Sequence, residues 1–417
     1  MKHYVIIGGS IAGMNCIEGI RSVDPDGPIT LISAEPDSNY CRPLISYYLE
    51  GKTDRERMRY RAPDFFAVNG CEVRSGVRAE KLLPDKKQVQ LSDGGVVDYD
   101  ALCVATGSSP FVPRFEGLET VDETKRFFFT QLTDALSLEQ AVDSTTRVLV
   151  IGAGFIGLKC AEGLTGRVAE ITVCDLADRA MSSILDADSA PILERRLRAN
   201  GLNLLLGDSA VHFDGCTALM KSGKTLEFDI LVLAIGTRPN TALLAEAGAA
   251  VGRGVQINDR METSLPDVWA AGDCVESVDV TTGEAGLLAI LPNASLQGRC
   301  AGVNMAGGEA VFDKGIRMNS IGFYGMHIMT AGNYFTGEDG GAAYANITET
   351  RCKKLFTRDG YLTGFILVDD ISHAGIYTAL IRERTPLEQI DFDAVKKQPS
   401  LLPFGKTYRA QKLGGVV

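Results

Sequence analysis

Short runs of apolar residues along the chain are followed twice by a glycine turn and then by apolar residues at helical spacing. The first run, 4–7, leads into a turn at 8–13 and a helical pattern that extends to Ile20. The run 148–151 leads into a second turn at 152–157, about 144 residues further on. Continuous apolar runs bounded by turns are typical of buried parallel strands. The pattern predicts an α/β fold with two strand–turn–helix units.

Glycines in such turns let the backbone approach a pyrophosphate, whose charge rests on the N-terminus of the next helix. The second turn has the full G-x-G-x-x-G spacing, whereas the first has Ser10 where a second glycine is usual. The next apolar run ends near Glu35 in the first unit and at Asp175 in the second, and a carboxylate there suits ribose hydroxyls. Two such units predict one flavin and one nicotinamide dinucleotide.

Two further segments repeat one another and indicate an internal duplication. Segments 99–107 and 228–240 are both apolar strands that run into a turn of small residues, and each closes one nucleotide-binding unit. The segment 265–273, which ends in Ala-Gly-Asp, follows them. With these five motifs in this order, residues 1–310 resemble the FAD- and NAD(P)-dependent pyridine-nucleotide oxidoreductases. The resemblance implies FAD at the first turn, NAD(P)H at the second, and Asp273 beside the flavin ribityl chain and phosphates.

A narrower resemblance concerns the flavin side. Segment 40–47 is similar to the Tyr-x-Arg-Pro-x-x-Ser segment of rubredoxin and ferredoxin reductases and of the FAD domain of nitrite reductase. It implies that Arg42 supports the flavin pyrophosphate, a role that suits a guanidinium. Segment 291–298 resembles the flavin-side helix of the same branch, and residues after 312 resemble, more loosely, the C-terminal domain of rubredoxin reductases.

The implied fold is α/β, with two Rossmann-like domains of the glutathione-reductase type and a C-terminal α/β cap. The expected FAD domain is discontinuous, 1–115 and 241–311, with the NAD(P)H domain at 116–240 and the cap at 312–417. The residues expected to bind the two cofactors are Gly8, Ser10, Ile11, Ala12, Gly13, Glu35, Arg42, Pro43, Ala105, Thr106, Gly107, Gly152, Gly154, Phe155, Ile156, Gly157, Asp175, Ile235, Gly236, Gly272, Asp273 and Pro292.

Charge at the end of the second unit bears on the choice of coenzyme. Asp175 would accept hydrogen bonds from a 2′-hydroxyl and repel a 2′-phosphate. Arg179 is four residues further on, but no basic cluster follows immediately. The sequence therefore favours NADH over NADPH.

Two positions depart from the family pattern. Related reductases usually carry Glu where this chain has Lys159, and often Lys where it has Tyr47. If the two positions face each other across the flavin, Lys159 could alter the coenzyme preference or the flavin potential, because a cation favours the anionic reduced flavin. Lys159 is thus a candidate catalytic residue, and the alternative is a surface lysine without a role.

The chain has ten cysteines, which is many for a sequence with no visible secretory signal. No pair has C-x-x-C spacing and the four histidines show no catalytic or zinc-site spacing, so we expect no metal and mostly buried, apolar roles. Cys41 lies within segment 40–47 and next to Arg42, so it is the one candidate redox thiol. The alternative is a structural thiol that only neighbours the flavin.

Composition and charge exclude other classes. The net charge of −11 argues against nucleic acid as a main partner. No apolar run reaches the about 20 residues of a membrane helix, and the N-terminus enters a strand at once instead of a signal-peptide h-region. The sequence therefore predicts a cytoplasmic protein without membrane contact, and it is silent on oligomeric state.

The electron acceptor is the open question. Electrons entering from NADH could leave singly to an acidic iron–sulfur or rubredoxin-like carrier, which could dock on the basic stretch 52–61. That stretch also contains Asp54 and Glu56, so it is alternatively an ordinary mixed-charge surface. Two other functions stay open: a thiol-assisted NADH oxidase, peroxidase or disulfide reductase using Cys41, and a flavin-carrying subunit of a larger electron-transfer complex.

Overall fold

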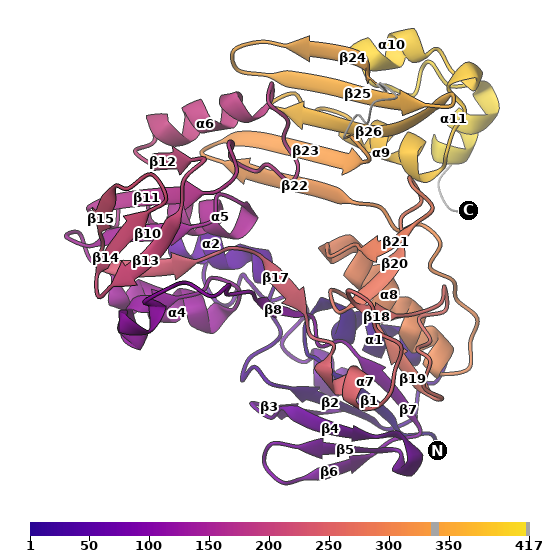
Figure 1. The fold of residues 1–417 in the computed structure, drawn as a ribbon. Coiled ribbons are helices and arrows are strands. Elements are labelled where there is room, and N and C mark those ends of the chain that lie inside the picture. Colours follow the sequence, from indigo (N-terminus) through magenta and orange to yellow (C-terminus); the bar gives the residue numbers. More distant parts are fainter. Residues whose placement is uncertain (335–341, 414–417) are drawn as a thin grey trace.

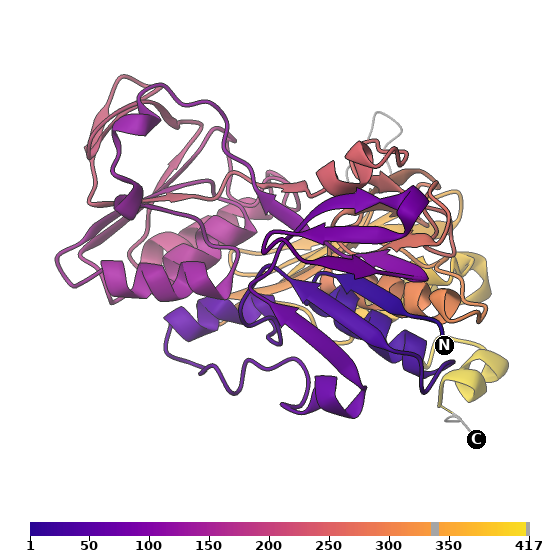
Figure 2. The ribbon, with the colours of Figure 1, turned by 90° about the horizontal axis from the view of Figure 1, so that it is seen from below.

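A computed structural model describes residues 1–334 and 342–413 of the 417-residue chain. The ribbon has three lobes, each built around a sheet (Figure 1). We name them by the ranges expected from the sequence: the N-terminal unit (1–115 and 241–311), the middle unit (116–240) and the C-terminal unit (from 312). The view from below shows the middle unit set to one side of the other two (Figure 2).

The N-terminal unit contains a five-stranded parallel sheet in the order β19-β7-β1-β2-β3. Every residue of its central strand is buried, as expected of a strand covered on both faces. Helices α1 (Ile11–Arg21) and α8 (Leu291–Met305) pack closely together on this sheet (Figure 1). The strands are β1 (Tyr4–Ile7), β2 (Ile29–Ser33), β3 (Cys71–Ser75), β7 (Ala101–Val104) and β19 (Val268–Ala270).

The middle unit repeats this architecture, with a parallel sheet in the order β12-β11-β10-β16-β9. Its helices are α4 (Leu132–Ala141), α5 (Phe155–Leu164) and α6 (Ala190–Ala199). The two parallel sheets confirm the predicted α/β fold with two strand–turn–helix units. The strands are β9 (Arg126–Phe127), β10 (Arg147–Ile151), β11 (Glu170–Asp175), β12 (Asn203–Leu206) and β16 (Ile230–Leu233).

The C-terminal unit is an antiparallel sheet in the order β22-β23-β26-β25-β24, with helix α9 (Ala374–Arg382) packed on β26 and β23. Helices α10 (Phe392–Lys397) and α11 (Lys406–Leu413) follow. The strands are β22 (Met318–Phe323), β23 (Met326–Gly332), β24 (Ala342–Ile347), β25 (Cys352–Arg358) and β26 (Tyr361–Val368).

Smaller elements complete the three units. Strands β8 (Ser108–Pro110) and β17 (Thr237–Pro239) pair where the chain passes between the N-terminal and middle units. Helix α2 (Ile45–Leu49) lies against α5 and α4, and α3 and α7 are one-turn helices at Phe65–Val68 and Ala242–Glu246. Three three-stranded sheets are formed by β4 (Ala79–Leu83), β5 (Gln88–Leu91) and β6 (Val96–Asp98); by β13 (Ala210–Asp214), β14 (Thr217–Met220) and β15 (Thr225–Glu227); and by β18 (Val255–Gln256), β20 (Val275–Val278) and β21 (Ala285–Leu287).

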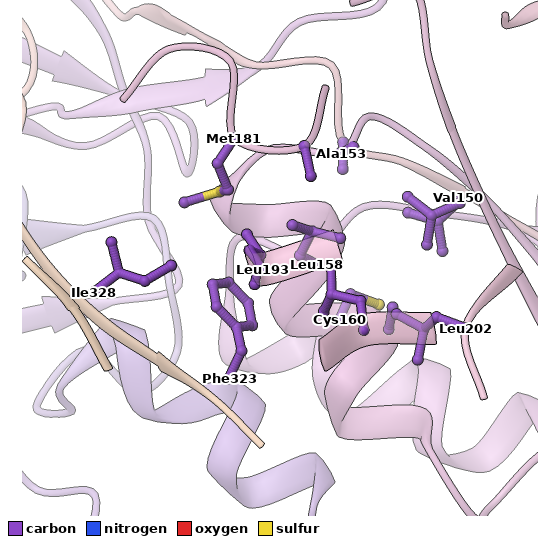
Figure 3. Close-up of a cluster of buried hydrophobic side chains, with 14 of the residues drawn as sticks. Val150, Ala153, Leu158, Cys160, Met181, Leu193, Leu202, Phe323 and Ile328 are labelled. Carbon is purple, nitrogen blue, oxygen red and sulfur yellow. The ribbon is translucent and has the colours of Figure 1, made fainter. Parts of the chain in front are cut away.

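One hydrophobic cluster joins all three units. It contains Leu49 of α2, Leu158 of α5 and Phe323 and Ile328 of the β22–β23 hairpin, all of them buried. In the close-up, Phe323 and Ile328 face Leu158 and Leu193 of the middle unit (Figure 3). The units are therefore packed against one another through apolar side chains. Within the described residues, no helix is long and apolar enough to span a bilayer.

Candidate functional site

The first glycine turn is tightly closed against neighbouring backbone. A Cβ atom at Gly8, where φ is +116°, would lie 2.0 Å from the carbonyl oxygen of Ala105, and one at Gly13 would lie 1.9 Å from that of Gly8. Only glycine fits at either position. Ser10 is the N-cap of α1 but its side chain makes no capping hydrogen bond, and Ile11 and Ala12 form the first turn. The N–H groups at this helix end therefore remain suited to an anion.

The Ala-Gly-Asp motif lies beside this turn. A Cβ atom at Gly272, where φ is +87°, would lie 3.1 Å from the Ala12 Cβ, so the segment after β19 crosses the start of α1. The amide oxygen of Gln297 accepts a hydrogen bond from Gly272 N at 2.9 Å, which orients this backbone. Burial raises the pKa of Asp273, and the positive charge of Arg42 opposes that shift. A half-buried carboxylate thus lies next to the segment that crosses the start of α1, where the ribityl chain of a flavin dinucleotide could donate to it.

Arg42 has protein partners of its own. It forms an ion pair with Glu35 at 2.5 Å and donates to the carbonyl of Thr130 at 2.7 Å. The hydroxyl of Tyr40 donates to the other oxygen of Glu35 at 2.6 Å. A carboxylate offers about four lone-pair sites, so Glu35 retains room to accept from a ribose. Pro43 continues the short turn Arg42–Leu44 that leads into α2.

The second glycine turn has the same geometry with one informative difference. A Cβ atom at Gly152 would lie 2.2 Å from the carbonyl oxygen of Ala234, and one at Gly157 would lie 1.9 Å from that of Gly152. A Cβ atom at Gly154, the N-cap of α5, would meet no described atom within 4 Å. Gly154 therefore borders open space in front of the helix, where Phe155 and Ile156 begin, and not a protein neighbour.

Asp175 ends β11, and its side chain is hydrogen-bonded to this turn. Its carboxylate accepts hydrogen bonds from Ala153 N at 2.7 Å and Ala177 N at 2.8 Å. Arg179 is directed elsewhere, since it pairs with Asp178 at 2.7 Å and donates to the carbonyl of Leu185 at 3.0 Å. The negative charge at the end of β11 is thus held in position, and the nearest arginine is engaged.

The two strand-end turns meet where the chain passes between the units. The hydroxyl of Thr106 donates to the carbonyl of Asn240 at 2.8 Å, and the Asn240 amide donates back to the carbonyl of Thr106 at 2.9 Å. The carbonyl of Gly236, where φ is +110°, accepts from Phe111 N at 2.9 Å. The segments Ala105–Gly107 and Ile235–Gly236 therefore lie where β8 and β17 connect the N-terminal and middle units. Pro292 lies elsewhere, in the first turn of α8.

Lys159 and Tyr47 face each other. The Lys159 ammonium lies 4.6 Å from the centre of the Tyr47 ring and forms an ion pair with Glu162. Only 12% of the lysine side chain is exposed, which excludes the surface-lysine alternative. Glu162, the partner of Lys159, also lies beside Tyr324. Burial raises the pKa of the Tyr324 hydroxyl to about 12, and the negative charge of Glu162 adds to this shift.

Cys41 lacks the environment of an activated thiol. Burial raises the pKa of this thiol, whereas a nucleophilic cysteine needs its pKa lowered. All ten cysteines are free, and seven of them are buried. Cys41, Cys71 and Cys216 are only half-buried.

The basic stretch 52–61 is largely neutralised. Four of its five basic residues pair with acidic side chains: Lys52 with Glu50 at 3.1 Å, Arg55 with Asp37 at 3.4 Å, Arg57 with Asp54 at 3.4 Å and Arg61 with Glu18 at 2.7 Å. The pairs made by Arg55 and Arg57 are exposed and stabilise the protein little, so these two arginines can exchange them for a partner's carboxylates. The structure thus shows the mixed-charge surface that was the alternative to a purely basic docking site.

Three residues near the site were not identified as functional from the sequence. Tyr40 lies in segment 40–47 with Arg42, and Gln297 lies in segment 291–298 directly before Gly298. Both segments resemble the reductase family, so the sequence could have indicated these two residues as part of the flavin site. Glu162 carried no such signal, because its partner in the C-terminal unit is far away in sequence.

Comparison with known proteins places these observations in context. The family model for pyridine nucleotide-disulphide oxidoreductases matches residues 2–298. The chain is 33% identical over 393 residues to the NADH-dependent phenylglyoxylate dehydrogenase subunit epsilon of Aromatoleum evansii, with 92% of each chain covered. It is 31% identical to putidaredoxin reductase CamA of Pseudomonas putida, over 65% of this chain and 66% of that one. A crystal structure of a covalent putidaredoxin reductase–putidaredoxin complex superimposes with a TM-score of 0.86 at 23% identity, covering 95% of this chain and 96% of that one.

Proposed function

Because the chain belongs to the pyridine nucleotide-disulphide oxidoreductase family and is thus an NAD(P)H-dependent flavin oxidoreductase, we propose that NADH is its donor and a small iron–sulfur or rubredoxin-like protein its acceptor. The observation that carries this proposal is the contact between α2 and α5, since α2 follows the Arg42 segment of the first site and α5 begins at the second glycine turn. Two dinucleotides bound at these sites would therefore approach each other at one junction.

The residues of each site have distinct tasks in this proposal. The Gly8–Gly13 turn, Asp273 and Arg42 would hold the flavin dinucleotide, and the turn that begins at Gly152, with Asp175, would hold the coenzyme. Bound FAD would supply the redox chemistry, because a flavin takes up a hydride and can release electrons singly or in pairs. The protein's own contribution is to bind, orient and enclose the two rings, and no side chain has to transfer a proton for the first half of the reaction.

The donor preference predicts the behaviour of an Asp175 variant. Asp175→Asn removes the charge that would repel a 2′-phosphate and keeps one oxygen, which can still accept from one of the two N–H groups, of Ala153 and Ala177, that now donate to separate carboxylate oxygens. We expect the ratio of kcat/KM for NADPH to that for NADH to rise about tenfold, which corresponds to about 1.4 kcal/mol. Steady-state kinetics with both coenzymes measure this ratio. Glu170→Gln, at the opposite end of β11, is the control and should leave the ratio unchanged; an unchanged ratio in Asp175→Asn would contradict the assignment.

The acceptor proposal predicts the effect of reversing two exposed charges. In Arg55→Glu/Arg57→Glu, reduction of an acidic iron–sulfur carrier at low ionic strength should slow about tenfold, because charge complementarity speeds encounter. Reduction of the flavin by NADH should be unaffected. The control is Lys221→Glu/Lys224→Glu at the exposed tip of the β14–β15 hairpin, which changes the net charge equally. Stopped-flow traces with unchanged carrier kinetics would eliminate this docking surface.

The thiol-dependent alternative predicts a different result for Cys41. Because burial raises the pKa of this thiol, we expect Cys41→Ser to retain flavin reduction and turnover with small acceptors to within about twofold of wild type. Anaerobic flavin reduction and oxidase assays measure both steps. A loss of turnover with small acceptors, while NADH still reduces the flavin, would instead favour the thiol mechanism.

A second candidate function is favoured by one comparison. The match to a subunit of an NADH-dependent dehydrogenase extends over 92% of both chains. The acceptor could then be an iron–sulfur centre in a partner subunit instead of a free carrier. Purification of the tagged chain from its own cell, followed by mass spectrometry of the copurified proteins, distinguishes the two. A stoichiometric iron–sulfur subunit supports the complex, and a chain that purifies alone and reduces a free carrier supports the first proposal.

A further inference from the structure

A lysine and a glutamate one turn apart on α5 form an ion pair that is buried where the three units meet. Lys159 pairs with Glu162, and their side chains are 12% and 4% exposed. The ammonium also donates to the carbonyl of Gly322 at 3.3 Å, and the second oxygen of Glu162 accepts from Tyr324 N at 2.6 Å. The pair therefore holds the turn between β22 and β23 against the helix of the middle unit.

The same ammonium contacts the N-terminal unit. It lies 4.6 Å from the centre of the Tyr47 ring in α2 and 5.5 Å from that of Phe323 in β22. A cation over an aromatic ring is attracted by its negative face, more strongly when water is excluded. One turn further along α5, a Cβ atom at Gly163 would lie 3.1 Å from the Leu49 Cβ, so the two helices approach closely. Lys159 thus contacts all three units through one charged group.

The position of the Lys159 ammonium matters because the two helices that it contacts, α5 and α2, adjoin the two proposed cofactor sites. Helix α5 begins at the glycine turn of the coenzyme site, and α2 directly follows the Arg42 segment of the flavin site. The spacing of α5 and α2 consequently sets the separation of the two sites. Hydride transfer requires reacting atoms about 3–3.5 Å apart, and a misplacement of about 1 Å can cost about 100-fold in rate. The ion pair is neutral overall, so its main effect is on position.

We propose that Lys159, together with Glu162, is a positioning residue for hydride transfer, which fixes the helix of the coenzyme site against the helix that follows the flavin segment. The C-terminal hairpin takes part, because Gly322 and Tyr324 complete the hydrogen bonding of the pair. This inference rests on the proposed function, since it assumes FAD at the first site and NADH at the second.

The test compares two double variants of the FAD-loaded protein. Lys159→Met/Glu162→Gln removes both charges, leaves neither ion unpaired, and keeps an oxygen for Tyr324 N. The control is Lys354→Met/Asp186→Asn. Lys354 is also 12% exposed and pairs with Asp186 at 2.6 Å, so it likewise joins the C-terminal sheet to the middle unit but away from α2. Lys159→Arg tests whether a different cation restores the contact.

Rapid mixing with NADH under anaerobic conditions gives the limiting rate of flavin reduction and the half-saturating NADH concentration. We expect Lys159→Met/Glu162→Gln to lower the limiting rate at least about tenfold, with a change of less than about threefold in the half-saturating concentration. The control should stay within about twofold of wild type on both measures, and Lys159→Arg should recover most of the rate. A general loss of stability would not lower the limiting rate of flavin reduction while leaving the half-saturating NADH concentration nearly unchanged.

Hydrogen exchange of the oxidised, FAD-loaded protein provides a readout without turnover. Amides of α5 and of residues 322–326 should exchange faster in Lys159→Met/Glu162→Gln and not in the control. A limiting rate within about twofold of wild type, or an equal loss in the control, would overturn the inference while leaving the proposed function intact. If NADH does not reduce the flavin of the wild-type protein, the proposed function itself is overturned, and this inference falls with it.

Discussion

Replacing Gly13 with Ala should abolish flavin binding. The new Cβ atom would lie 1.9 Å from the carbonyl oxygen of Gly8, and neither atom belongs to a flexible side chain that could move aside. The turn would have to open, which would displace the backbone that approaches the pyrophosphate. We expect the purified variant to be colourless and destabilised by at least about 3 kcal/mol, at the upper end of overpacking effects. Flavin content and thermal unfolding measure both effects.

The control for this change is Gly375→Ala. Gly375 also lies inside a helix, but a Cβ atom there would meet no described atom within 4 Å. Alanine is favoured over glycine in a helix by up to about 1 kcal/mol, so this variant should keep its flavin and be as stable as wild type or slightly more so. A Gly13→Ala variant that retains FAD with unchanged stability would show that the first turn is not the flavin site.

Replacing Gly154 with Val should separate coenzyme binding from folding. The position borders open space in front of α5, and its φ of −88° is accessible to any residue. The protein should therefore fold and hold FAD normally, whereas the valine side chain would occupy the path of the coenzyme pyrophosphate. We expect kcat/KM for NADH to fall about 100-fold or more, with a smaller loss in Gly154→Ala because a methyl group fills less of the path. Steady-state kinetics and flavin content measure the two effects.

The two glycine positions give opposite expectations for stability. Gly157→Ala would bring a Cβ atom to 1.9 Å from the carbonyl oxygen of Gly152 and should destabilise the turn itself. Gly154→Val should not. If Gly154→Val binds NADH as wild type does, the open space in front of α5 is not the coenzyme path, and the assignment of the second turn fails.

Local patterns in the sequence predicted the fold well, because a strand, a glycine turn and a helix are each specified by neighbouring residues. The turns at Gly8 and Gly152 close against carbonyl oxygens within their own units, as the G-x-G-x-x-G pattern implies. The family resemblance and the fold class are confirmed by the family match and by the two parallel sheets.

Contacts between units could not be predicted in the same way. Whether Lys159 is a surface lysine or a buried one depends on Gly322 and Phe323, more than 160 residues away. The pairing of Glu35 with Arg42 and the neutralisation of the basic stretch likewise depend on loop conformations that no periodicity encodes. These are also the places where the sequence left alternatives open, since side-chain partners are set by tertiary packing.

An anaerobic titration of the purified, FAD-loaded chain with NADH shows whether the two glycine turns serve one hydride-transfer reaction. We expect one equivalent of NADH per FAD to bleach the visible flavin absorbance completely in the wild-type protein, whereas Gly154→Val should need a large excess. An added iron–sulfur carrier should then reoxidise the bleached protein. A chain that binds FAD but whose flavin absorbance does not change with NADH would contradict the proposed electron transfer from NADH to the flavin.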